Sequence, residues 1–452
     1  MKDENAGQDI VCGNARCRIF RYKVGRIRRL EKCLIAATFL YSYVGVAHAD
    51  DGNSLELYGV LDVAIGGVEH SASASPLYAS TVNSVSKVSS QFNRPVYGMF
   101  NGGISDSRWG IRGTEDLGGG LHAFFDLESG INVQSGTLNN GAGSIAGSNT
   151  TFAQASALNG QFFNRGAYLG LRQDQYGSLS FGRTTTLGYD TIINYDPMFA
   201  AQLFSPLGIS GSYSAGGITE GSRTDNNIKY TNHSGPFNYG ISYSLGSVAG
   251  KFGDGSTYGV NLGYEANNFG VQATYYHARD EVHSGALVGA NPIGSTQIGT
   301  NVGALTLNDD QDIMIAAKYS FGATTLKAGY EHYELKAPSD PAATGANVDY
   351  YGYSGTLTDT VIPTKTNVYF AGGDRKITQN IDIAAGFYDT QTVQSAGVKG
   401  GNQLQYSVLV DYHLSHHTDV YAGYMFSKYN GAAFVGYEPT NYIVATGIRT
   451  MF

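Results

Sequence analysis

The chain has 452 residues, among them 61 glycines and 33 tyrosines, with only 15% charged side chains and a formal net charge of −8. This composition favours many short strands and turns over helical domains. The acidic balance argues against a nucleic-acid partner, which would need a basic surface.

The first 49 residues are predicted to form a cleaved export leader, followed by one domain over residues 50–452. A basic stretch, Arg26 to Lys32, precedes an apolar stretch, Leu34 to Val46, and the sequence Ala47-His48-Ala49 forms the cleavage site. The alternative is a buried strand or helix at this position. All three cysteines lie in the leader, so the domain has none for a disulfide, a thiolate metal site or a nucleophile. The domain has 20 basic and 33 acidic side chains, a net charge of −13.

The first predicted strand covers residues 55–65, where leucine, valine and isoleucine share one face. Glu56, Tyr58 and Asp62 share the other face, as expected when successive side chains point to opposite sides of a strand. No later apolar run reaches the eighteen residues of a transmembrane helix. Outer-membrane strands remain possible, because they are marked by alternation over about ten residues.

A hairpin follows over residues 107–128, and it shows which face meets lipid. Trp109 and Ile111 lie on one side of its first strand, and Arg108 and Arg112 lie on the other. An arginine that faces hydrocarbon near the bilayer midplane costs about 2–4 kcal/mol in a barrel. The arginine face is therefore predicted to point inward.

Thirteen later segments repeat this alternation, which makes sixteen strands. Their apolar members fall within 167–171, 179–181, 228–230, 239–243, 258–264, 269–275, 313–319, 326–330, 368–370, 381–387, 406–412, 420–426 and 442–452. In the segment 368–370 these members are Val368 and Phe370. Tight turns alternate with long polar loops, and tyrosines cluster at strand ends. This pattern predicts an all-β, antiparallel transmembrane β-barrel in the outer membrane; a soluble β-sandwich array is the alternative.

The stretch Thr184 to Asp225 interrupts the alternation for about forty residues. An insert of this length in a compact domain is usually functional or disordered. It carries apolar residues, including Ile192, Met198 and Phe204, that a freely solvated loop would not need. We therefore predict that it folds into the hollow of the barrel and narrows it.

Several motifs, in this order, resemble the general, non-specific porins of β-proteobacterial type. They are Ser107–Leu121, Asn164–Leu171, Phe181–Arg183, Arg223–Tyr230 and Gly447–Phe452. The resemblance implies a homotrimer of sixteen-stranded barrels, each narrowed by its third long loop, in contact with outer-membrane lipid and lipopolysaccharide. It also implies that the C-terminal Phe452 addresses the chain to the barrel-assembly machinery. The domain is long for this family.

The predicted function is passive diffusion of ions and small hydrophilic solutes. The inward basic residues predicted on the wall are Arg108, Arg112, Arg183, Arg223 and Lys229. The predicted acidic residues on the loop are Asp190, Asp196 and Glu220. By resemblance, Arg108, Arg183 and Arg223 match a wall cluster that faces loop acids across the opening. The alternative is that these arginines are solvated and paired locally. Because the acids are sparse, the sign of selectivity stays open, with a lean towards anions.

Three other functions are alternatives. A substrate-specific, eighteen-stranded porin for a sugar or an organic acid would need an aromatic track, for which Tyr189, Tyr195 and Tyr213 are candidates. An enzyme is disfavoured, because G-x-S-x-G, H-E-x-x-H and Walker motifs are absent from the sequence. No cofactor or metal site is expected, and the pair His416-His417 is predicted to be solvated. A structural or adhesin barrel would require a plugged lumen.

Overall fold

The computed structural model describes residues 53–71, 94–138, 162–207, 222–246, 250, 252–279, 283–284, 305–306, 309–336, 339, 347–350, 353–356, 364–393, 400–431 and 440–452. The chain divides into two units, Met1–His48 and Ala49–Phe452. The predicted leader and its cleavage site after Ala49 lie outside the described residues and stay a prediction.

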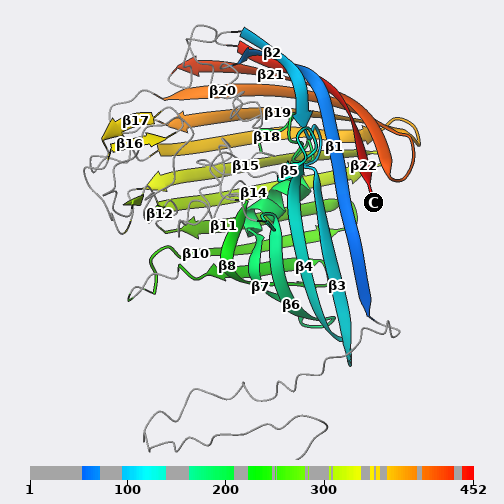
Figure 1. The fold of residues 1–452 in the computed structure, drawn as a ribbon, viewed down its shortest axis with the longest axis vertical. Helices are drawn as coiled ribbons and strands as arrows, with labels where there is room; N and C mark the ends of the chain where they lie inside the picture. The colour runs from blue at the N-terminus through cyan, green and yellow to red at the C-terminus, as the bar shows by residue number, and fades with distance from the viewer. Residues whose placement is uncertain are drawn as a thin grey trace, which may run out of the picture. The chain divides into compact units, whose positions relative to one another are not determined.

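Sixteen antiparallel strands form the wall of the second unit. They are β1 (Ser54–Ser71), β3 (Arg108–Gly118), β4 (Leu121–Asn132), β6 (Gly166–Gln173), β7 (Gly177–Thr185), β8 (Arg223–Ser234), β9 (Phe237–Ser244), β10 (Thr257–Ala266), β11 (Phe269–Ala278), β14 (Asp309–Phe321), β15 (Thr324–Lys336), β18 (Thr364–Lys376), β19 (Ile381–Val393), β20 (Gly401–His413), β21 (Thr418–Gly431) and β22 (Thr440–Met451). Each pairs with its neighbour along this order, and β22 pairs with β1, so the barrel is closed (Figure 1). The predicted count of sixteen is confirmed, and the eighteen-stranded alternative is wrong.

Strand β1 is shared by two partners on the side opposite β22. Its first half pairs with β3, and its second half pairs with the short strand β2 (Arg94–Asn101). Residues 102–107 connect β2 to β3 and leave the wall between them. We call this connection the inner shelf, because it packs against the inward-facing Tyr421 of β21 and against the inserted loop.

The two faces of the wall differ as the alternation predicted. Leu57, Leu169 and Leu262 are more than 60% exposed on the outer face, where the barrel wall presents an apolar surface. One segment is reversed: Val368 and Phe370 are buried inside, and Tyr369 is exposed. The prediction for this segment was wrong because the lumen is partly filled by protein, so an inward position there favours apolar side chains.

The inserted loop is not structureless. It begins with α3 (Leu187–Tyr195), whose N-cap Thr186 accepts a hydrogen bond from the Tyr189 amide at 3.1 Å. Strand β7 runs to Thr185 and β8 starts at Arg223, so the loop covers 186–222 rather than 184–225. Short strands β5 (Thr137–Leu138), β12 (His283–Ser284), β13 (Leu305–Thr306), β16 (Asn347–Tyr350) and β17 (Tyr353–Thr356) lie outside the ring. No helix among the described residues is long and apolar enough to span a membrane.

Candidate functional site

The inserted loop packs its apolar side chains against one side of the barrel interior. Leu187, Ile192, Met198 and Phe204 are completely buried. Ile192, Met198 and Phe204 share one cluster with inward residues of β14, β18, β19, β20, β21 and β22. Glycines on the wall allow this close approach: a Cβ built on Gly423 would lie 2.6 Å from the Phe204 ring. The prediction that the loop folds into the barrel is therefore confirmed.

Asp196 fastens the middle of the loop to the wall instead of facing the lumen. Its carboxylate is fully buried and accepts hydrogen bonds from the Tyr388 hydroxyl and the Ala200 amide, both at 2.6 Å. Lys327 Nζ donates to the Asp196 carbonyl at 3.0 Å. Burial raises the pKa of Asp196, although the Tyr388 and Ala200 bonds act in the opposite direction. The expectation that Asp196 borders the opening is corrected, because its side chain is enclosed between loop and wall.

The inner shelf contacts the loop at a second point, residues 202 and 203, and is itself held by Asp62 of β1. The buried Asp62 carboxylate accepts hydrogen bonds from the amides of Gly103 (3.1 Å), Ile104 (3.0 Å) and Ser105 (2.7 Å). In the opposite direction, the shelf carbonyls accept from loop residues 202 and 203, at 3.3 and 3.0 Å. The shelf therefore links a wall carboxylate to the loop backbone.

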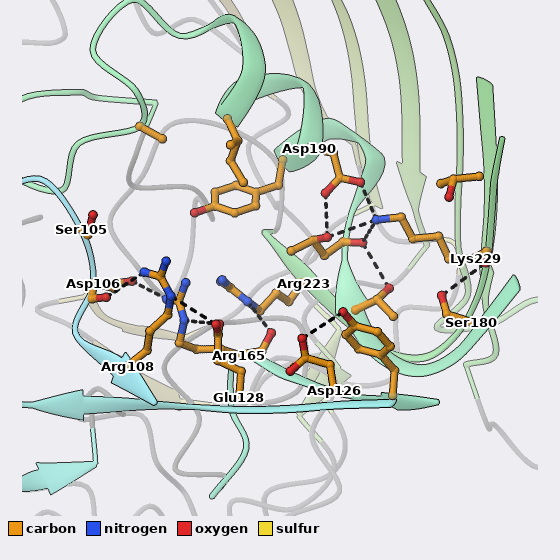
Figure 2. Close-up of a pocket in the computed structure, with 18 of the residues that line it drawn as sticks. Ser105, Asp106, Arg108, Asp126, Glu128, Arg165, Ser180, Asp190, Arg223 and Lys229 are labelled. Carbon is orange, nitrogen blue, oxygen red and sulfur yellow. Dashed lines mark hydrogen bonds and ion pairs between the residues drawn. The ribbon is translucent and has the colours of Figure 1, made fainter. Parts of the chain in front are cut away.

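A cavity of about 570 Å³ lies between the loop and the wall strands β3, β4, β6, β7 and β8. Figure 2 shows its charged side chains, with three arginines together on one side and Lys229 with Asp190 on the other. The loop borders the cavity with residues of α3 and with residues 199, 200 and 202. The cavity is thus bounded by the inserted loop on one side and by the wall strands on the other.

Three arginines and two carboxylates form a network at this cavity. Arg165 Nη1 lies 2.7 Å from Asp106 Oδ2, and its Nε lies 2.7 Å from Glu128 Oε1. Arg108 Nε lies 3.2 Å from Glu128 Oε2. Arg223 donates from Nε to the Arg165 carbonyl at 2.7 Å. Burial lowers the pKa of Arg165, but Glu128 and Asp106 raise it by more, so this guanidinium stays charged.

Asp190 and Lys229 form the second charged group at the cavity. Lys229 Nζ is ion-paired with Asp190 Oδ2 and donates to the Thr185 carbonyl at 3.0 Å. The Thr185 hydroxyl donates to the other Asp190 oxygen at 2.7 Å. Of the two predicted loop acids that the structure describes, Asp190 is the one that borders the cavity, and a wall lysine holds it.

Two predicted basic residues lie apart from the cavity lining. Arg183 is buried in the wall, where its Nε donates to the Asn164 carbonyl and its Nη1 pairs with Asp225, both at 2.7 Å. A β-bulge beside it, with Gly182 at φ 132°, changes which way its side chain points. Arg112 pairs with Glu56 at 2.8 Å in an exposed position.

The remaining predicted residues are at the chain's end and in the loop. Glu220 lies outside the described residues, so its predicted role stays a prediction. Phe452 is the last residue, and its backbone pairs with Gly59 of β1 through bonds of 2.9 and 3.1 Å. Its side chain is exposed on the outer face.

Arg165, Asp106 and Glu128 were missed as site residues. Glu128 carried a signal, because it lies on the inward face of the predicted hairpin. Arg165 precedes its strand and Asp106 is on the shelf, so neither lies in an alternating segment. Arg165 does lie in the motif Asn164–Leu171, but the motif does not indicate which residues Arg165 pairs with.

The sequence pattern of the Gram-negative porins matches residues 36–432. The chain belongs to this family. An outer membrane porin protein of Bordetella pertussis is 34% identical over 218 residues, and the match spans only 48% of each chain. Outer membrane porin protein 32 of Delftia acidovorans is 25% identical over 425 residues, or 93% of this porin and 95% of the relative.

Solved structures show the same fold. An anion-selective porin from Comamonas acidovorans superposes with a TM-score of 0.58 at 19% identity, over 88% of this chain and 100% of the other. The family places this porin in the outer membrane of a Gram-negative bacterium and makes it a channel protein, not an enzyme.

Proposed function

We propose that this porin lets ions and small hydrophilic solutes diffuse passively through the cavity beside the inserted loop. The supporting observation is that the loop is fastened to the wall at Asp196 and at the inner shelf and leaves about 570 Å³ open beside β3–β8. A barrel of sixteen strands is too wide for its wall side chains to fill. The loop therefore sets the narrowest ring, and width and charge there decide passage.

Anions are the preferred ions in this proposal. Arg165, Arg108 and Lys229 have carboxylate partners, whereas Arg223 forms no ion pair within the described part of the chain. At physiological salt the screening length is about 8 Å, so a charge in the narrow opening still acts on a passing ion. The low-dielectric wall strengthens its field.

Reversal potentials across planar bilayers test this proposal. Replacing Arg223 or Arg108 by glutamine is expected to raise the cation-to-anion permeability ratio, because each change removes a positive charge from the cavity lining. Arg112→Gln is the matched control, since Arg112 lies outside the lining and is exposed beside Glu56. Unchanged reversal potentials in both cavity variants would contradict the assigned route.

We also propose a homotrimer, in contact with lipid and lipopolysaccharide through the apolar outer face and delivered to the barrel-assembly machinery by Phe452. A trimer form of OmpT from Vibrio cholerae has the same fold, with a TM-score of 0.54 at 13% identity over its whole length. The exposed outer leucines support the lipid contact. Electrophoresis of unheated protein tests the trimer: migration only as a monomer would contradict it.

A further inference from the structure

Among the described residues, the loop side of the cavity carries exposed apolar side chains and one acid, Asp190. Ile193 and Phe199 both border the cavity and are 46% and 43% exposed. The two described loop acids are engaged elsewhere, Asp190 with Lys229 and Asp196 inside the wall contact. A solute in the opening therefore meets hydrocarbon on the loop side.

The exposure of Phe199 is maintained against a backbone cost. Phe199 and Ala200 have φ values of 59° and 54°, a region that costs residues other than glycine about 1–2 kcal/mol each. The Asp196 carboxylate holds this conformation through the Ala200 amide. Lys327 Nζ lies 4.4 Å from the centroid of the Phe199 ring. Such strained residues cluster at functional sites, and here the strain presents an aromatic ring to the lumen.

The opposite side of the cavity offers a guanidinium with donors to spare. Arg223 is 3% exposed, and its described bonds are those to the Arg165 carbonyl and, at 3.2 Å, to the Ser222 hydroxyl. An arginine has five N–H donors, so these two bonds leave others for a solute. The guanidinium carbon of Arg223 lies over the Tyr189 ring, 5.3 Å from the ring centroid.

We propose that the opening selects amphipathic organic anions, meaning carboxylates that carry a compact apolar body such as an aromatic ring. The carboxylate binds at Arg223, and the apolar body lies against Ile193 and Phe199. Chloride and acetate use only the first contact, and a neutral aromatic molecule uses only the second. This inference rests on the proposed diffusion route through the same cavity.

Block of the chloride current by benzoate tests the inference on the purified porin in planar bilayers at pH 7.5. Benzoate is expected to reduce the current at concentrations well below those of acetate, and benzamide is expected to act weakly. Both comparisons are matched, since acetate lacks the ring and benzamide lacks the charge. Equal effects of benzoate and acetate on an otherwise normal chloride current would overturn the inference alone. Absence of any chloride current would overturn the proposed function as well.

Two variants locate the apolar contact. The variants Ile193→Thr and Ile193→Val place side chains of nearly the same shape at this position. The two variants therefore differ mainly in the polarity of that side chain. Loss of an apolar contact of about 1 kcal/mol corresponds to a roughly fivefold weaker benzoate block, which is expected for the threonine variant and not for the valine variant. Phe199→Asn removes the ring while keeping a residue that tolerates positive φ, and it should weaken the block similarly. Equal block in the Ile193 pair, or unchanged block in Phe199→Asn, would contradict the assigned contact.

Discussion

Replacing Asp62 by asparagine tests whether the inner shelf holds the inserted loop. The Asp62 carboxylate accepts from three consecutive shelf amides and from the Tyr421 hydroxyl. An asparagine side chain has the same shape, but one of its two atoms is a donor. In the less costly orientation the NH₂ group replaces the oxygen that faces Gly103 and Tyr421, because the Tyr421 hydroxyl can turn and accept.

The free-energy cost of Asp62→Asn follows from the number of hydrogen bonds that are lost or weakened. One buried backbone donor without an acceptor costs about 1–3 kcal/mol, and the two remaining amide bonds each lose about 1 kcal/mol of charge assistance. The shelf is thus destabilised by about 3–5 kcal/mol. Strand β1 keeps its pairing with β2, β3 and β22, so the barrel itself should persist.

Single-channel recording measures the consequence. A released shelf no longer holds loop residues 202 and 203, so Asp62→Asn is expected to show a higher mean conductance and larger current fluctuations than the parent porin. Folding is checked by the heat-dependent shift of the barrel on a gel. Asp116→Asn, at the exposed end of β3, is the control. A folded Asp62→Asn barrel with the conductance and noise of the parent would refute the role of the shelf.

Two further predictions concern the wall and the loop contact. Arg183→Met is expected to leave the reversal potential unchanged but to lower thermal stability, because the part-buried Asp225 carboxylate loses its 2.7 Å ion pair with a buried guanidinium, a loss of at most about 3–5 kcal/mol; a shifted reversal potential would show that Arg183 acts on passing ions. Gly423→Ala places a Cβ against Phe204 and should displace the loop, which raises the conductance, whereas Gly98→Ala meets open space and should not. Equal conductance in the two alanine variants would contradict the tight contact.

The alternation of side chains predicted the barrel well because lipid outside and water inside impose opposite polarity on neighbouring positions. It failed at Val368 and Phe370, where the inward face meets the loop instead of water. Alternation with a period of two shows only that the two faces of a strand differ in polarity. It does not show whether the apolar face meets lipid or a lumen filled by protein. The sequence around the loop signalled its inward folding but not the wall residues that receive it.

The charged site was predicted less well because partners depend on positions far apart in the chain. Asp196 looked like a lumen acid, yet its partner Tyr388 lies 192 residues away. Arg183 stands in a motif of the resemblance, but a bulge at Gly182 turns its side chain into the wall. Neither the bulge nor a contact of this range leaves a periodic signal in the sequence.

In the proposed route, pairing rather than the number of charges accounts for the preference for anions. Four basic and four acidic side chains are among the described residues that line the cavity, so a count predicts neutrality. Asp126 has no ion pair within that set, but it accepts hydrogen bonds from Tyr58 and Tyr168 at 2.7 and 3.4 Å. Both residues thus have neutral hydrogen-bond partners, but each oxygen of Asp126 already accepts a hydrogen bond, whereas Arg223 keeps N–H donors that the described residues do not use. A net-neutral lining can therefore favour anions.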